Sequence, residues 1–109
     1  MSYKVLTIPY FDRQLKRLVK KFPSLKNDFK ELVTSLSESP LQGDYLGKSS
    51  YKIRLSITSK GKGKSGGARV ITHILIQDNI VFLLSIYDKS EKSSISNEEL
   101  KELIKFVKG

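Results

Sequence analysis

The stretch KSSYKIRLSITSKGKGKSGGAR, residues 48–69, decides how this chain folds and what it can bind. Its first half alternates apolar and polar side chains, as a strand with one buried face does. Ile53 and Leu55 belong to the apolar face, whereas Lys52 and Arg54 lie side by side on the other. These residues therefore predict a strand that buries one face and presents cations on the other.

A glycine-rich basic loop follows this strand and carries Lys60, Lys62 and Lys64 between glycines, and a second strand begins at Arg69. Residues 48–69 contain seven cationic side chains and no acidic one, so they hold +7 of the formal net charge of +9. Charge concentrated on one element is the electrostatic footprint of a site for a polyanion. Nucleic acid is the leading candidate and an anionic membrane surface the lesser one. The alternative without a ligand is a solvated basic face kept for solubility.

Length and composition limit the other possibilities. The 109 residues, 39% of them hydrophobic, predict one domain over residues 1–109 with a real core. Cysteine is absent, which excludes disulfides, thiol nucleophiles and cysteine-ligated zinc and fits a reducing cytoplasm. No apolar run has the length of a signal peptide or a membrane span, so we expect a soluble cytoplasmic protein.

Hydrophobic periodicity predicts an α+β domain with helices packed on one face of a sheet. The expected order is a strand at 3–9, a helical hairpin over 11–22 and 24–39, three antiparallel strands at about 50–58, 68–77 and 80–87, and a final helix. Ser96 and Glu99 form a capping box for that last helix. Residues 41–49 are expected to be a loop, and residues 78–79 a hairpin turn.

Two familiar kinds of site find little support. Gly63-Lys64-Ser65 matches the end of a phosphate-binding loop, but that motif needs glycine where Thr58 stands and must lead into a helix. We therefore reject a nucleotide-binding loop. His73 is the only histidine, and no Asp, Glu or His cluster has metal-ligand spacing, so neither a metal nor a cofactor is expected.

The remaining possibility is catalysis by cationic side chains acting on a phosphate. RNA carries its own nucleophile, the 2′-hydroxyl, and Lys or Arg can stabilise the charge that builds on the phosphate oxygens. Crowded cations also lower the pKa of a lysine, which can make it a usable base. By alternation His73 shares a face with Arg69 and is a secondary candidate, against a structural role. Tyr87 and Lys89, just past the last strand, could stack a base and add charge, although Tyr87 could equally be packing.

Three segments carry a resemblance to a known family: YKIRL at 51–55, KGKGKSGGARVI at 60–71 and FLLSIYDKSE at 82–91. They resemble the RelE/HigB-type toxins of bacterial type II toxin–antitoxin modules, within the RelE/ParE superfamily. The branch that is most similar is HigB-like and carries a KGKGK-x-GG-x-R loop. The order of strand, helical hairpin and three strands agrees over nearly the whole chain.

The resemblance implies a small metal-independent endoribonuclease that cuts mRNA in the ribosomal A site. In RelE-like members, lysines and arginines on the concave face of the sheet carry catalysis. Carried over by motif, the catalytic positions are Lys52, Arg54, Arg69 and Lys89. Arg69 is the leading candidate for stabilising the transition-state phosphate. RelE also uses a tyrosine near the C-terminus, where Ile95 stands here, so the general base or acid is unassigned; other HigB proteins use histidine, which keeps His73 as a candidate.

The resemblance also implies macromolecular partners. A cognate antitoxin protein would silence the toxin, and the complex would bind operator DNA through the antitoxin. The other partners are mRNA and the ribosome, including ribosomal RNA. The expected RNA-binding positions are Lys48, Lys60, Lys62, Lys64, Tyr87 and Lys92.

Two other functions remain open on the sequence. A ParE-like toxin shares the fold but poisons DNA gyrase through protein–protein contact, and the set of Lys52, Arg54 and Arg69 argues against it. A catalytically silent module would bind RNA with a steep salt dependence and leave transcripts intact.

Overall fold

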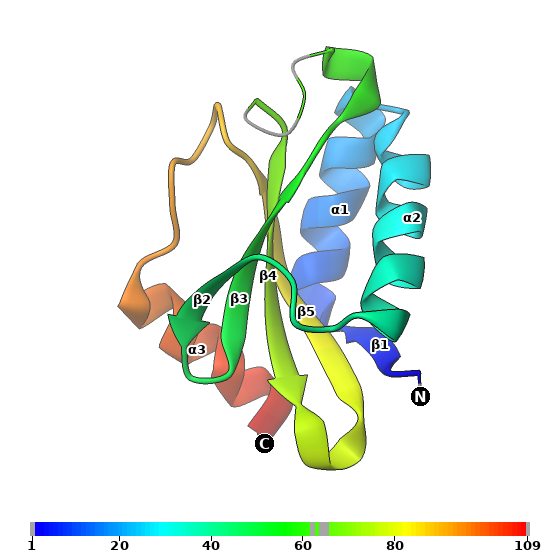
Figure 1. Ribbon diagram of the computed structural model, residues 1–109. Helices are drawn as coiled ribbons and strands as arrows, with labels where there is room; N and C mark the ends of the chain where they lie inside the picture. Colours follow the sequence, from blue (N-terminus) through cyan, green and yellow to red (C-terminus); the bar gives the residue numbers. More distant parts are fainter. Residues whose placement is uncertain (1, 62, 64–65, 109) are drawn as a thin grey trace.

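Apolar strands pair into a sheet at the centre of the computed structural model, which describes residues 2–61, 63 and 66–108 (Figure 1). Within these residues the sheet has five strands in the order β1-β5-β4-β3-β2. The strands are β1 (Lys4–Thr7), β2 (Asp44–Gly47), β3 (Ser50–Leu55), β4 (Ala68–Leu75) and β5 (Ile80–Asp88). The helices are α1 (Pro9–Lys21), α2 (Leu25–Glu38) and α3 (Asn97–Lys108), with short 3-10 turns η1 (Thr58–Lys60) and η2 (Ile76–Asp78). β1 runs parallel to β5 and the other neighbouring pairs are antiparallel.

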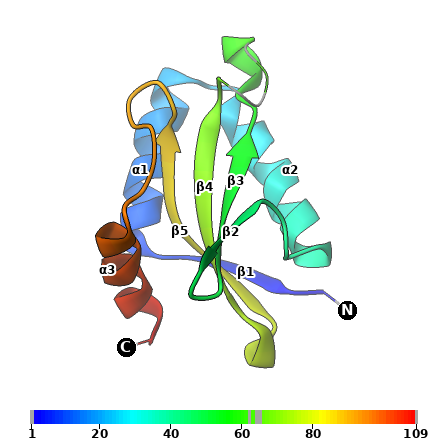
Figure 2. The same cartoon turned by 60° about the vertical axis from the view of Figure 1, so that its left-hand side comes forward.

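The predicted helical hairpin is confirmed and forms one layer of the fold. α1 begins at Pro9, whose fixed φ suits the first helical turn, and it buries Phe11 and Leu18. α2 buries an apolar stripe that includes Leu25 and Leu36. Figure 2 shows both helices behind the sheet. The core therefore lies between this hairpin and one face of the sheet.

β5 is buried over most of its length, as its nearly continuous apolar sequence predicts. It lies between β4 and β1, but β1 pairs only with residues 80–83. Beyond that point α1 closes the edge, because Gln14 Oε1 accepts hydrogen bonds from the Ile86 N–H at 3.0 Å and the Ser85 hydroxyl at 3.1 Å. The second half of β5 is thereby held in place without a strand on that side.

The expected loop at 41–49 is wrong in part, because residues 44–47 form β2 and pair with β3. The connection is a two-residue hairpin turn in which Lys48 and Ser49 have φ of 53° and 59°. Positive φ at both central residues is the type I′ pattern, usually signalled by Asn-Gly or Asp-Gly. This turn uses Lys48 and Ser49 instead, so the usual signal for a hairpin is absent here. β3 also ends at Leu55, earlier than predicted.

α3 follows the polar segment 89–96 and lies beside β5, on the side of the sheet away from α2 (Figure 1). The predicted capping box is confirmed: the Glu99 N–H donates to Ser96 Oγ at 3.1 Å, and the Ser96 N–H donates to Glu99 Oε1 at 3.2 Å. Leu100, Leu103 and Ile104 are the buried stripe of this helix. Among the residues described, none of the helices has the length and apolar composition needed to cross a membrane.

Candidate functional site

A row of side chains crosses three strands on the face of the sheet that α1 and α2 leave uncovered. Arg54 of β3 pairs with Arg69 of β4, and Arg69 pairs with Tyr87 of β5. Directly opposite residues in a sheet project to the same side about 5 Å apart, and Lys52 follows two residues along β3, about 7 Å away. The register thus brings together three of the predicted catalytic cations, Lys52, Arg54 and Arg69.

The three cations differ in their access to solvent. Arg54 is exposed and Lys52 is half-buried, and neither forms an ion pair within the described part of the chain. Arg69 is only 3% exposed, and its Nη1 donates to the carbonyl of Ala68 at 3.1 Å. Like charges directly opposite each other destabilise a sheet, and an anion would relieve that repulsion. Lys52 and Arg54 are the cations that such an anion can reach, and the buried Arg69 lies beside Arg54.

Tyr87 closes the row at β5 and is buried, 4% exposed. Burial raises the pKa of Tyr87, while the nearby charge of Arg69 lowers it and that of Glu99 raises it. Lys92 Nζ lies 5.6 Å from the centre of the tyrosine ring. A covered ring cannot offer its face to a base, so this geometry favours the packing role of Tyr87 over the predicted stacking role.

The remaining predicted lysines are spread around the site. Lys89 and Lys48 are exposed, the first just past β5 and the second in the β2–β3 turn. Lys92 pairs with Glu99, and hydrogen bonding from Lys92 lowers the pKa of that glutamate more than its partial burial raises it. The charge of Lys92 is therefore largely compensated. The predicted RNA-binding positions Lys62 and Lys64 lie outside the described residues.

Lys60 is engaged inside the fold. Its Nζ donates to Asp88 Oδ1 at 2.9 Å and lies 5.2 Å from the centre of the Phe22 ring. The two charged side chains are 12% and 1% exposed, respectively. Asp88 pairs with Ala68 and so projects to the face opposite the row of Arg54 and Arg69. These facts argue for a structural role of Lys60 rather than the predicted contact with RNA.

His73 is also part of the interior. It is 2% exposed, and its Nδ1 lies 3.0 Å from the hydroxyl of Ser50, its partner across the strands. It shares a face with Arg69, as alternation predicts, but four residues along a strand separate them by about 13 Å. Because the ring is buried and lies far from Arg69, the geometry favours a structural role over that of general base.

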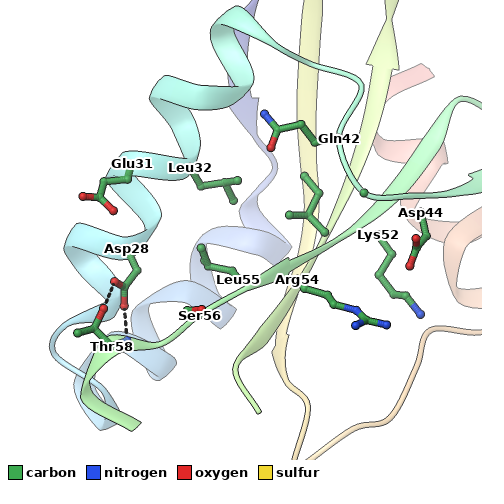
Figure 3. A pocket seen from close by; sticks show the side chains of 12 residues that line it. Asp28, Glu31, Leu32, Gln42, Asp44, Lys52, Arg54, Leu55, Ser56 and Thr58 are labelled. Atoms are coloured by element: carbon green, nitrogen blue, oxygen red, sulfur yellow. Dashed lines mark hydrogen bonds between the residues drawn. The ribbon is translucent and has the colours of Figure 1, made fainter. Parts of the chain in front are cut away.

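An open cavity of about 710 Å³ lies where β3 extends beyond β2 (Figure 3). Asp28, Glu31 and Leu32 line it from α2, while Lys52 and Arg54 line it from β3. Figure 3 shows the two cations projecting from the strand on the side away from α2. The cavity therefore adjoins the face of the sheet that carries Lys52 and Arg54, and its α2 wall carries negative charge from Asp28 and Glu31.

Sequence reasoning missed two buried carboxylates that shape the site. Asp28 accepts hydrogen bonds from the Thr58 N–H at 3.0 Å and the Thr58 hydroxyl at 2.6 Å, so it caps η1 at the start of the basic loop. Asp88 is the acidic partner of Lys60. An acidic residue at the end of an apolar strand was the available signal for Asp88. Among the described residues, no group of three or more His, Cys, Asp or Glu side chains is placed to hold a metal ion.

Comparison with known proteins identifies the family. Residues 9–109 match the family described as the RelE toxin of the RelE/RelB toxin–antitoxin system. This chain belongs to that family of toxins, whose partner is a cognate antitoxin. The free RelE toxin of E. coli, as a double arginine-to-alanine mutant, has the same fold with a TM-score of 0.64 and 22% identity, covering 98% of this chain and 99% of that one. The isolated E. coli RelE toxin in another crystal structure gives 0.58 and 21%, covering 97% and 99%.

Proposed function

We propose that this toxin is an endoribonuclease that cuts mRNA on the ribosome and so inhibits translation. The observation that carries the proposal is the cationic row, in which Lys52, Arg54 and Arg69 lie together on one face of the sheet, with Lys52 and Arg54 accessible to solvent. Membership of the RelE family supports the same activity. The cognate antitoxin, mRNA and ribosomal RNA are its proposed partners, and the cytoplasm its place of action.

The proposed mechanism uses the nucleophile of the substrate. The 2′-hydroxyl attacks the adjacent phosphorus, the bond to the 5′-oxygen of the next nucleotide breaks, and a 2′,3′-cyclic phosphate and a 5′-hydroxyl result. Arg54 and Lys52 hold the phosphate, and their charge stabilises the additional negative charge of the pentavalent transition state. Arg69, the buried member of the row, adds its charge beside Arg54, and Lys89 adds another from the end of β5.

The experiment measures cleavage of mRNA bound to programmed ribosomes by the purified toxin. Arg54→Gln and Lys52→Gln each remove one accessible charge from the row, and we expect each to slow cleavage by ~100-fold, as loss of one transition-state donor does. Arg13→Gln is the matched control, because Arg13 is an exposed arginine of α1 on the other side of the sheet. Its cleavage rate should equal that of the wild type.

New 5′ ends restricted to ribosome-bound mRNA, and lost in the two row variants, would support the proposal. Equal cleavage by Arg54→Gln, Lys52→Gln and Arg13→Gln would show that the cations of the row do not contribute to catalysis. Intact mRNA with blocked DNA supercoiling would favour gyrase poisoning. Intact mRNA with salt-sensitive RNA binding would leave a silent binding module.

A further inference from the structure

The chain makes a tight turn immediately after β5, and the carboxylate of Asp88 holds it. Asp88 Oδ1 accepts the Ser90 N–H at 3.0 Å, which is the hydrogen bond of an Asx turn. The carbonyl of Asp88 accepts the Glu91 and Lys92 N–H groups at 3.0 and 3.1 Å. Lys89 stands at the corner of this turn, and its own N–H donates to the carbonyl of Gly67 at 3.1 Å. Asp88 thus fixes the backbone of the turn that carries the exposed Lys89.

Lys60 supplies the positive charge that stabilises this buried carboxylate. Its Nζ reaches the same Oδ1 that accepts the Ser90 N–H. Burial by itself would raise the pKa of Asp88, but the hydrogen bond from Lys60 and those from Ser90 hold the pKa below its ordinary value. The carboxylate is therefore ionised at neutral pH, although only 1% of it is exposed.

The buried pair lies on the opposite face of the sheet from the cationic row. Asp88 shares a face with Ala68 and Leu55, whereas Arg54, Arg69 and Tyr87 occupy the adjacent row and point the other way. Neither Lys60 nor Asp88 can therefore touch a phosphate bound by Arg54 without leaving the interior. Lys89 is exposed and follows Tyr87, the end of that row on β5, by two residues.

We propose that Asp88 is a positioning residue for Lys89 and that Lys60 is its buried counter-charge, so that this pair acts on the reaction only through the turn. The inference rests on the proposed cleavage of RNA, in which Lys89 adds charge to the site. It also assigns Lys60 to the fold rather than to RNA binding.

Two double variants isolate the turn from the charges. Lys60→Met with Asp88→Asn removes both charges but keeps an oxygen acceptor for the Ser90 N–H. Lys60→Met with Asp88→Ala removes the same charges and the acceptor. For each we would measure the single-turnover cleavage rate on programmed ribosomes, the affinity for a short RNA, the melting temperature, and hydrogen exchange of the Ser90 amide. The pair of variants is matched in charge, so differences between them report the turn.

We expect the Asn variant to cleave near the wild-type rate. The Ala variant should cleave at least about tenfold more slowly, since misplacement of a group by ~1 Å can cost ~100-fold. Both should bind RNA as the wild type does, and the Ser90 amide should exchange faster only in the Ala variant. When Lys89→Gln is added to both variants, the Ala variant should cleave no more slowly than the Asn variant.

Each other result overturns the inference in a distinct way. Equally slow cleavage by both variants would mean that the charges themselves are needed. Weaker RNA binding with a shallower salt dependence in both would show that Lys60 contacts RNA. Equal wild-type rates in both would show that the turn does not matter. A wild type that cuts no ribosome-bound mRNA would refute the proposed function itself, and the Ser90 exchange would still report whether Asp88 holds the turn.

Discussion

Removing the charge of Lys60 alone should destabilise this protein more than removing the charges of Lys60 and Asp88 together. Lys60→Met leaves the Asp88 carboxylate buried without its cation, whereas the double variant Lys60→Met/Asp88→Asn leaves no charge at that place. The prediction follows from the burial of both partners and from their 2.9 Å contact.

The magnitude can be worked from the structure. Breaking a buried ion pair by removing one partner costs about 3–5 kcal/mol. We expect the lower end, about 3 kcal/mol, because Asp88 keeps the Ser90 N–H as a donor and Lys60 is not fully buried. An unfolding entropy of about 2.1 cal/mol/K per residue gives about 0.23 kcal/mol/K for a chain of this length, so the melting temperature should fall by about 13 °C. The double variant should lie within about 1 kcal/mol of the wild type.

Thermal unfolding followed by circular dichroism at pH 7 would measure the wild type, Lys60→Met, Asp88→Asn and the double variant. Lys105→Met is the matched control, because Lys105 belongs to an exposed pair with Glu102 and its loss should leave the melting temperature unchanged. A double variant as unstable as the sum of the two single variants would refute the reasoning, because it would mean that the two charges do not interact.

The same pair predicts how stability depends on pH. The pKa of Asp88 is lower in the folded protein than in the unfolded chain, so its contribution is fully present above the unfolded pKa. That contribution should be lost as the pH falls below about 4, through the folded pKa. In Lys60→Met this acid-side loss should be smaller, as melting temperatures measured from pH 7 to pH 2 would show. An identical acid-side loss in both proteins would contradict it.

Three further substitutions test single features of the fold. Gly67→Ala would place a Cβ 2.2 Å from the carbonyl oxygen of Leu55, which is backbone and cannot turn away, so the free energy of unfolding should fall by about 2 kcal/mol or more in urea titration. His73→Leu should lower that free energy by about 1 kcal/mol through the lost hydrogen bond with Ser50, yet leave cleavage unchanged. A folded His73→Leu protein that no longer cleaves would restore His73 as a catalytic candidate. Tyr87→Phe should leave the melting temperature unchanged or higher, because the hydroxyl is buried with no hydrogen-bond partner among the described residues. A clear loss of stability in that variant would mean that the hydroxyl is satisfied.

The sequence by itself determined the features that depend on local periodicity. The alternation in β3 places Lys52 and Arg54 on one face, and the apolar stripes of α1 and α2 predict the helical hairpin. Ser96 and Glu99 cap α3 as their spacing requires. These predictions succeed because each depends on residues a few positions apart, which the backbone geometry of a strand or helix relates directly.

Tertiary structure alone decided which cations face solvent and which are buried in contacts inside the protein. Lys60 and Arg54 look alike in a basic stretch, but Lys60 meets a carboxylate 28 residues away, whereas Arg54 remains exposed. The burial of Arg69 and His73 likewise depends on the layers that pack around β4. The physical reason is that charge pairing and desolvation depend on distances between segments that are remote in sequence, and only the packed sheet sets those distances.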